Sequence, residues 1–470
     1  METIGPSKII PLLNADQIFL AEKNIIESTQ PGENLYLSHY SLPTPGEVPS
    51  VGTPASSAQR ELLSKLVYQV QKNKVNAYVI ADNSRTPENP WEKTHNEKAI
   101  QFLHETGTFV LPYPKDYVAI NHSKFVGNER AVVISSCNAS RHSADSPDDN
   151  TGFLMTGPAA QNGITQSFMP QWNFSVEKDS AGWSKGYRFL NRDGVLLPDN
   201  VVAWLNTAPK EELHQAEDRT EIKSAYEELI DEAADAPAES YLYFEHFDLS
   251  HIHLTFKLLS AKEKNPSLDL RFIIDPNQYL EGLKNGGHDA RVIAYDLLKN
   301  AKIPVRFALV RPHPNGDKDP QRFHDKYAVF NDCKVLNGSG NFSSHALDGN
   351  GVGENHPSRP HPHNREIDVL VRDPQVARIS LAIATKIRRR FSKCSSSLAS
   401  RISSSLDSCF LEILESFVTP STKTATSFPN SFRISSNVTA QSSTTSCNSA
   451  AAIVAESNLS CVMIFATSIG

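Results

Sequence analysis

Short apolar runs alternate with amphipathic stretches along most of this chain, which predicts strands alternating with helices. The same order of elements occurs twice. The predicted strands are Leu35–Tyr40, Ala77–Asp82, Thr108–Leu111 and Ala131–Ile134 in the first half, and Leu242–Phe247, Leu270–Asp275, Val305–Val310 and Lys334–Leu336 in the second. The helices predicted between them are Ser57–Lys72, Glu97–Thr106, Leu249–Lys264 and Ala290–Asn300. This alternation predicts an α/β fold with mixed sheets that are covered on both faces.

The spacing of matching residues indicates that the two halves are copies of one architecture. His39 ends one predicted strand 83 residues before His122, and His246 ends its counterpart 78 residues before His324. We therefore predict a first half over residues 1–172, a connecting segment over 173–209 and a second half over 210–393.

Residues 394–470 differ in composition from the rest of the chain. From Phe391 to Gly470 there are 22 serines and one glycine, with little helical periodicity. A solvated, disordered tail is the default interpretation. The alternative is a reading frame that shifted shortly before this segment.

Charge and cysteine content narrow the possible partners. The net charge is −7, and because Val376–Gly470 carries +5, the remainder carries −12. An acidic main body argues against a long track for nucleic acid. The six cysteines form no C-x-x-C pair, so neither a disulfide framework nor a zinc site is predicted.

The chain shows no signal peptide and no apolar run long enough to span a membrane. A cytoplasmic protein, or one attached peripherally to a membrane surface, is expected.

Two copies of one sequence motif contain the candidate catalytic residues. The first, HSKFVGNERAVVISSCN, runs from His122 to Asn138, and the second, HDKYAVFNDCKVLNGSGN, runs from His324 to Asn341. Residues two apart on a strand share a face, so the His and Lys of each copy point the same way. Two imidazoles can divide the cleavage of a phosphodiester into nucleophilic attack and proton donation. Lys124 and Lys326 would supply positive charge to the phosphate.

Each copy of the motif ends in a turn of small residues that can donate hydrogen bonds to phosphate oxygens. The donors are Ser136 and Asn138 in the first turn, and Ser339 and Asn341 in the second. The repeat also contains an asymmetry. Glu366 lies eight residues before Pro374, whereas Asn150 lies eight residues before Pro158. Only one histidine would then gain a charged supporting partner, which separates the two pKa values.

These residues resemble the duplicated pattern H-x-K-x4-D-x6-G-S-x-N of the phospholipase D superfamily. Asn331 and Glu129 replace the Asp, and the first turn reads Ser-Ser-Cys-Asn with a His-to-Asn spacing of 16 instead of 17. The resemblance implies two homologous α/β sandwich halves packed around a shared central active-site cleft.

The resemblance also implies roles for individual residues. His122 would be the nucleophile and His324 the general acid, with Glu366 supporting His122. The two lysines and the donors of the two turns would hold the phosphate, and Asn150 would be a supporting residue. No metal or cofactor is implied, and a monomer would contain the complete site.

Three functions remain open. The leading expectation is a phospholipase D-like enzyme that hydrolyses or transfers the phosphatidyl group of a phospholipid at a membrane surface. A metal-independent nuclease would use the same residues but is less compatible with the acidic body. A catalytically weakened phosphate-binding module is the third, because the first turn departs from the pattern.

Other histidines have alternative interpretations. His39 and His246 could form the floor of the pocket or be ordinary core residues. His356, His361 and His363 could suggest a metal, but their Pro-rich context favours a solvated loop.

Overall fold

The computed structural model describes residues 6–43, 54–82, 90–114, 117–139, 150–184, 186–189, 196–285, 289–308, 322–348 and 363–381 of the 470-residue chain. The serine-rich tail, His356 and His361 lie outside these residues. Among the described helices, none combines the length and apolarity needed to cross a bilayer.

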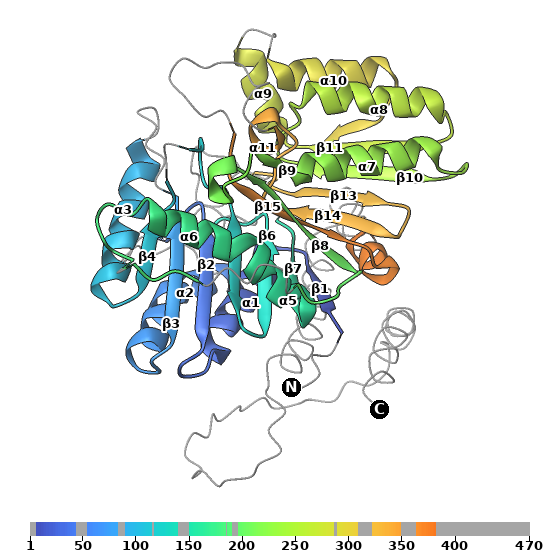
Figure 1. The fold of residues 1–470 in the computed structure, drawn as a ribbon. Coiled ribbons are helices and arrows are strands. Elements are labelled where there is room, and N and C mark those ends of the chain that lie inside the picture. The colour runs from blue at the N-terminus through green and yellow to red at the C-terminus, as the bar shows by residue number, and fades with distance from the viewer. Residues whose placement is uncertain are drawn as a thin grey trace, which may run out of the picture. The chain divides into compact units, whose positions relative to one another are not determined.

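The first half forms a seven-stranded mixed sheet in the order β1-β7-β6-β5-β2-β3-β4 (Figure 1). Strands β2, β3 and β4 are parallel, and the remaining neighbours are antiparallel. The strands are β1 Lys8–Leu12, β2 Asn34–His39, β3 Asn76–Ala81, β4 Phe109–Pro112, β5 Lys124–Asn128, β6 Ala131–Ser135 and β7 Gly152–Thr156.

The second half repeats this plan in an eight-stranded sheet with the order β12-β11-β10-β13-β14-β15-β8-β9. Strand β8 lies in the segment that connects the halves and pairs with β15. The strands are β8 Val202–Ala208, β9 Arg219–Thr220, β10 Tyr241–His246, β11 Asp269–Ile274, β12 Val305–Phe307, β13 Lys326–Phe330, β14 Lys334–Gly338 and β15 Glu366–Val371.

Helices cover the outer face of each sheet (Figure 1). The inner faces of the two sheets pack toward each other, and the helical segment 158–177 packs with them in a central layer. The first-half helices are α1 Ala15–Ser28, α2 Pro54–Gln71, α3 Pro90–Glu105, α5 Pro158–Gly163 and α6 Met169–Glu177, with a π-helical segment Ile164–Phe168 between the last two. The second-half helices are α7 Glu221–Asp235, α8 Ile252–Lys264, α9 Pro276–Lys284, α10 Ala290–Asn300 and α11 Ser344–Leu347. The expected pair of α/β halves with mixed sheets is confirmed.

Side-chain alternation along the strands sorts the core into layers. Leu35 and Leu37 of β2 pack with α1 and α2, whereas Tyr36 between them faces the second sheet. The central layer contains Trp172 of α6 and Trp204 of β8, both buried. These tryptophans therefore pack between the halves, as ordinary interface residues do.

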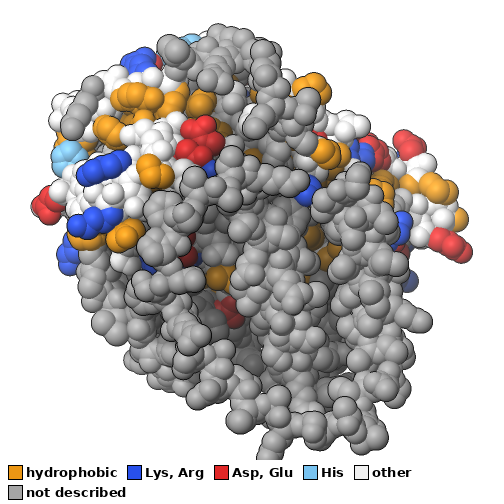
Figure 2. All heavy atoms as spheres, turned by 90° about the horizontal axis from the view of Figure 1, so that it is seen from below, with side chains coloured by type: hydrophobic (Ala, Val, Ile, Leu, Met, Phe, Trp, Pro, Cys, Tyr) orange, Lys and Arg blue, Asp and Glu red, His pale blue; other side chains and the backbone are white. Residues whose placement is uncertain are grey.

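The charges on the described surface are mixed. On the face shown in Figure 2, Lys and Arg side chains are interspersed with Asp, Glu and apolar side chains wherever the residues are described. That part of the surface therefore carries no field of a single sign.

Candidate active site

The two halves meet where the segment before β5 runs beside the segment before β15. Ala119 donates its backbone N–H to the carbonyl of His363 at 2.8 Å, and Arg365 donates to Ile120 at 2.8 Å. His122 then donates its backbone N–H to the carbonyl of Arg365 at 2.9 Å. This short ladder brings His122 of the first half beside Glu366 of the second, although 244 residues separate them.

The imidazole of His122 contacts the carboxylate of Glu366 directly. Nδ1 of His122 lies 3.0 Å from both carboxylate oxygens, which also accept from Ser339 Oγ at 2.6 Å and from Asn364 Nδ2 at 3.1 Å. Burial opposes ionisation, but the His122 contact and Lys124 hold the pKa of Glu366 below its ordinary value. An ionised Glu366 accepts from Nδ1–H and leaves Nε2 of His122 as the free nitrogen lone pair.

The matching contact in the other half uses an amide. Nδ1 of His324 lies 3.2 Å from Oδ1 of Asn150, which also accepts from Ser136 Oγ at 3.1 Å. The rings of His122 and His324 are 6.5 Å apart between centroids, with an interplanar angle of 78°. The structure therefore places the two imidazoles of the separate halves in one site.

Each lysine follows its histidine by two residues in the chain. Lys124 Nζ donates to the carbonyl of His122 at 2.6 Å, and Lys326 Nζ donates to that of His324 at 2.9 Å. Strands β5 and β13 begin at these lysines, so each histidine stands just before its strand instead of within it. Burial lowers the pKa of Lys124 to about 7 and that of Lys326 well below its ordinary value.

Both imidazoles are nearly covered in the protein. Burial lowers the pKa of His122 to about 4, in spite of the opposing effect of Glu366. Burial and the neighbouring lysines lower the pKa of His324 well below its ordinary value. In the unliganded protein both rings are therefore neutral at pH 7, and a bound phosphate dianion or monoanion would favour protonation of one of them.

The two turns approach the same site from strands β6 and β14. Ser136 donates its backbone N–H to Thr151 at 2.8 Å, and Ser339 donates to Ile367 at 3.0 Å, so both turns are held by the next strand. The Oδ1 atoms of Asn138 and Asn341 are buried and accept no hydrogen bond from the described residues. Ser136 joins the site through Asn150 and Ser339 through Glu366, and each is followed two residues later by its asparagine.

The two residues that depart from the family pattern lie at the opposite end of the strands. Asn331 Oδ1 accepts from the backbone N–H of Tyr241 at 2.7 Å, and Glu129 Oε1 accepts from the side chain of Asn34 at 2.8 Å. Each residue therefore fixes the start of the neighbouring strand, a strand's length from the imidazoles. An amide or a longer carboxylate can do this as well as the Asp of the pattern.

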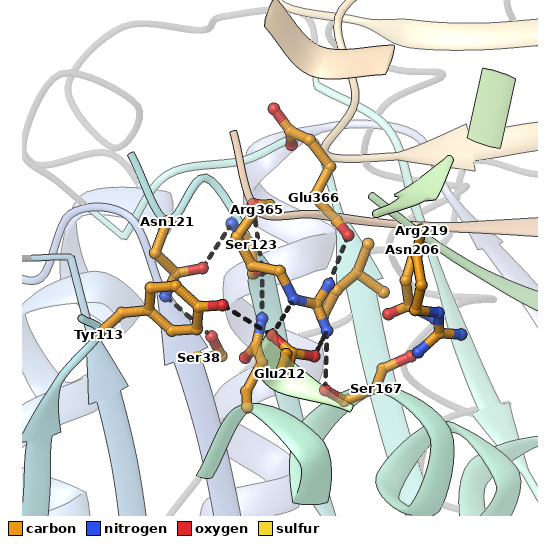
Figure 3. Close-up of polar contacts among 12 residues, drawn as sticks. Ser38, Tyr113, Asn121, Ser123, Ser167, Asn206, Glu212, Arg219, Arg365 and Glu366 are labelled. Carbon is orange, nitrogen blue, oxygen red and sulfur yellow. Dashed lines mark hydrogen bonds and ion pairs between the residues drawn. The ribbon is translucent and has the colours of Figure 1, made fainter. Parts of the chain in front are cut away.

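A buried ion pair behind Glu366 was not predicted from the sequence. The Arg365 guanidinium donates to both oxygens of Glu212 at 2.9 Å, to the carbonyl of Glu366 at 2.6 Å and to that of Ser167 at 3.1 Å (Figure 3). Tyr113 OH donates to Glu212 at 2.7 Å. In the sequence, only the position of Arg365 next to Glu366 could have suggested a role for this arginine. Its partner Glu212 could not have been inferred, because it lies 153 residues away in the chain.

The two core histidines differ in their surroundings. His246 Nε2 lies 3.0 Å from the hydroxyl of Tyr226, whereas the ring nitrogens of His39 have no hydrogen-bond partner among the described residues. The closest acidic atom to His39 is Oε1 of Glu22, at 3.8 Å. Burial raises the pKa of Glu22 to about 8, and burial and Lys124 lower that of His39 to about 3. Both histidines therefore lie under the lysines as neutral core residues.

This arrangement predicts a pH-dependent gain in stability for Glu22→Gln. The folded protein keeps a proton on Glu22 that the unfolded chain releases above pH 4.5, so the wild type loses stability as the pH rises from 4.5 to 8. Glutamine does not titrate. The difference in free energy of unfolding should favour the variant increasingly over that window, by at most about 1.4 kcal/mol per pH unit. Urea unfolding at several pH values measures it. Glu27→Gln, an exposed position on α1, is the matched control, and an equal response of both variants would contradict the prediction.

His363 is the described member of the predicted loop cluster. It is buried, and its Nε2 lies 3.4 Å from Asp218. The expectation of a solvated loop is therefore wrong for His363, because its segment runs between the two halves beside Ala119. Within the described ranges, no group of three or more His, Cys, Asp and Glu side chains is placed to hold a metal ion.

Comparisons with known proteins give matches among solved structures. No family model matches the sequence, and no curated protein matches it. A phosphatidylserine synthase from Haemophilus influenzae matches with 14% identity and a TM-score of 0.50, over 87% of this chain and 92% of that chain. The phospholipase D family member Nuc from Salmonella typhimurium matches with 18% identity and a TM-score of 0.27, over 39% of this chain and 91% of that chain. A polyphosphate kinase from Porphyromonas gingivalis matches with 12% identity and a TM-score of 0.43, over 88% of this chain and 56% of that chain.

Proposed function

We propose that this chain, whose fold is that of the phospholipase D superfamily, cleaves phosphodiester bonds through a covalent phosphohistidine. The observation that carries the proposal is the pair of imidazoles 6.5 Å apart, one held by a carboxylate and the other by an amide. A phosphorus atom between the rings would be within reach of a nitrogen on each side.

In the first step, the Nε2 lone pair of His122 attacks phosphorus and the bond from phosphorus to the leaving oxygen breaks. His324, protonated once the anionic phosphate is bound, gives its proton to that oxygen, so an alcohol leaves. Glu366 stabilises the positive charge that develops on the His122 ring. In the second step, His324 takes a proton from water or an alcohol, whose oxygen attacks phosphorus and releases His122.

The remaining site residues are proposed to hold the phosphate. Lys124 and Lys326 lie under the imidazoles and supply positive charge, which the phosphate itself would restore by raising their lowered pKa values. The two turns supply the side-chain amides of Asn138 and Asn341 as donors for the non-bridging oxygens. The hydroxyls of Ser136 and Ser339, which the sequence suggested as further donors, instead donate to Asn150 and Glu366 and so support the residues that hold the two imidazoles. The side chains of this site suffice for each proton transfer in the scheme.

The substrate that we favour is a phospholipid, with hydrolysis or transfer of its phosphatidyl group. The support is the charge of the body, which is −12 without Val376–Gly470 and is a poor match to a polyanionic nucleic acid. A nuclease is the second candidate because the same residues would serve it. A weakened phosphate-binding module is the third, motivated by the altered first turn.

The test compares the three candidates in one set of assays. Purified wild-type chain and its His122→Ala variant are incubated in EDTA with vesicles of phosphatidylcholine, phosphatidylethanolamine, phosphatidylglycerol and cardiolipin, and separately with single- and double-stranded DNA. Release of head group by the wild type alone supports the lipid enzyme, and cleavage of DNA alone would replace it with the nuclease. If neither substrate is cleaved, and acid quench traps no phosphohistidine, the enzyme proposal fails.

A further inference from the structure

The two phosphate-binding turns are held by different side chains that do the same task. Each turn has four residues, Ser135–Asn138 in the first half and Gly338–Asn341 in the second. In both, the backbone N–H of the third residue donates to a buried oxygen. The oxygen belongs to the turn itself in one half and to the neighbouring strand in the other.

In the second half, the N–H of Gly340 donates to Oδ1 of Asp368 at 2.8 Å. Asp368 is fully buried on β15, two residues after Glu366 and paired with Gly338 on β14. A Cβ added at Gly338 would lie 2.4 Å from Oδ1 of Asp368 and 2.4 Å from the backbone carbonyl oxygen of Ile367, so the carboxylate and the strand that carries it together fill the space that a side chain in the turn would need.

In the first half, the N–H of Cys137 donates to Oγ of Ser135 at 3.2 Å. Ser135 occupies the turn position of Gly338, and it too is fully buried. The strand position that matches Asp368 is Gly152, which is six residues before Pro158 as Asp368 is before Pro374. A Cβ added at Gly152 would lie 2.5 Å from the backbone carbonyl oxygen of Ile134 and 2.7 Å from Cβ of Ser135. In each half, therefore, the residue that accepts the hydrogen bond lies opposite a glycine, but the accepting residue is on the turn in one half and on the neighbouring strand in the other.

We infer that Asp368 and Ser135 are the positioning residues of the two phosphate-binding turns, each paired with a glycine that makes room for it. This inference rests on the proposed function, since the turns matter only if they hold a phosphate. It also accounts for the departure of the first turn from the Gly-Ser-x-Asn pattern. Serine in place of the first glycine keeps the turn anchored where the strand offers no carboxylate.

The test transfers the arrangement of the first half into the second. Four variants of the full chain are prepared: Asp368→Gly, Gly338→Ser, the double variant, and Asp368→Asn. Hydrolysis of bis(p-nitrophenyl) phosphate gives kcat and KM, and circular dichroism gives the folded fraction and the melting temperature of each protein.

Asp368→Gly leaves the buried N–H of Gly340 without an acceptor, so kcat/KM per folded molecule should fall about tenfold or more. Gly338→Ser alone places its Cβ against Asp368, so its kcat/KM per folded molecule should fall by a similar factor. The double variant should recover above both single variants, because the serine hydroxyl replaces the carboxylate as acceptor. It should stay below the wild type, because the serine Cβ still meets the backbone carbonyl oxygen of Ile367 at 2.4 Å. Asp368→Asn, which retains an acceptor oxygen, should also stay within about threefold.

Two results would overturn the inference: a folded Asp368→Gly variant with wild-type kcat/KM, or a double variant no better than the poorer single one. A failure of the proposed function can be distinguished from a failure of this inference. If the wild type cleaves no phosphodiester, the same proteins are titrated with inorganic phosphate by calorimetry, and the double variant should again bind more tightly than either single variant. If phosphate does not bind to the wild type either, the inference falls together with the proposed function.

Discussion

Replacement of His122 by alanine should abolish turnover, whereas replacement of His324 should leave a single burst with an activated substrate. Without His122 no nitrogen remains to attack phosphorus, so kcat should drop by at least about 10³-fold with every substrate. The nitrophenolate of bis(p-nitrophenyl) phosphate leaves without a proton, so His324→Ala should still form the phosphohistidine. Its breakdown should be slow because water is no longer deprotonated.

The measurement is rapid-quench kinetics with one equivalent of substrate, followed by detection of acid-labile, alkali-stable phosphate on the protein. The expected burst in His324→Ala approaches one nitrophenolate per active site, and His122→Ala shows none. Glu366→Gln serves as the control for position, because it retains the side-chain shape without the charge and should form the intermediate slowly. A burst in His122→Ala instead of His324→Ala would reverse the proposed roles of the two histidines.

Replacement of Arg365 by methionine should be the most destabilising of these changes. The guanidinium and the Glu212 carboxylate are both fully buried, and the variant leaves that carboxylate without its charged partner. Loss of one member of such a pair costs roughly 3–5 kcal/mol. Because the guanidinium also donates to the backbone carbonyl of Glu366, its loss should let Glu366 shift, and activity should fall in the fraction that remains folded.

Urea unfolding and melting temperature measure this effect, and an exposed pair provides the control. Lys264 pairs with Asp235 on the surface, where both side chains are more than half exposed. Lys264→Met should therefore change the free energy of unfolding by less than about 1 kcal/mol. A loss of similar size in both variants would mean that burial gives the Arg365–Glu212 pair no greater weight in stability than an exposed pair has. The double change Arg365→Met with Glu212→Leu should recover much of the stability, because it leaves no buried charge.

Local sequence patterns predicted most elements of the repeated core. The strand expected at Leu242–Phe247 is β10, Tyr241–His246, and the helix expected at Ala290–Asn300 is α10 with the same bounds. Side-chain periodicity depends on the backbone alone, so it can be read without knowing the partners of an element. Helix α7 was not predicted, although its buried residues Ile222, Tyr226, Leu229 and Ala233 follow a helical spacing that could have revealed it.

The amino-acid sequence by itself determined the duplicated order of elements, the placement of each histidine next to its lysine, and the contrast between Glu366 and Asn150 at one repeat position. These follow from residue spacing along a single chain. The family resemblance had implied that Glu366 supports His122, and the tertiary structure gives the geometry of that contact across the halves. Only the tertiary structure decided that Arg365 pairs with Glu212, and that Asp368 and Ser135 lie opposite Gly338 and Gly152. Those contacts join residues on separate strands or in separate halves, and their geometry depends on how the two sheets pack, which local periodicity does not encode.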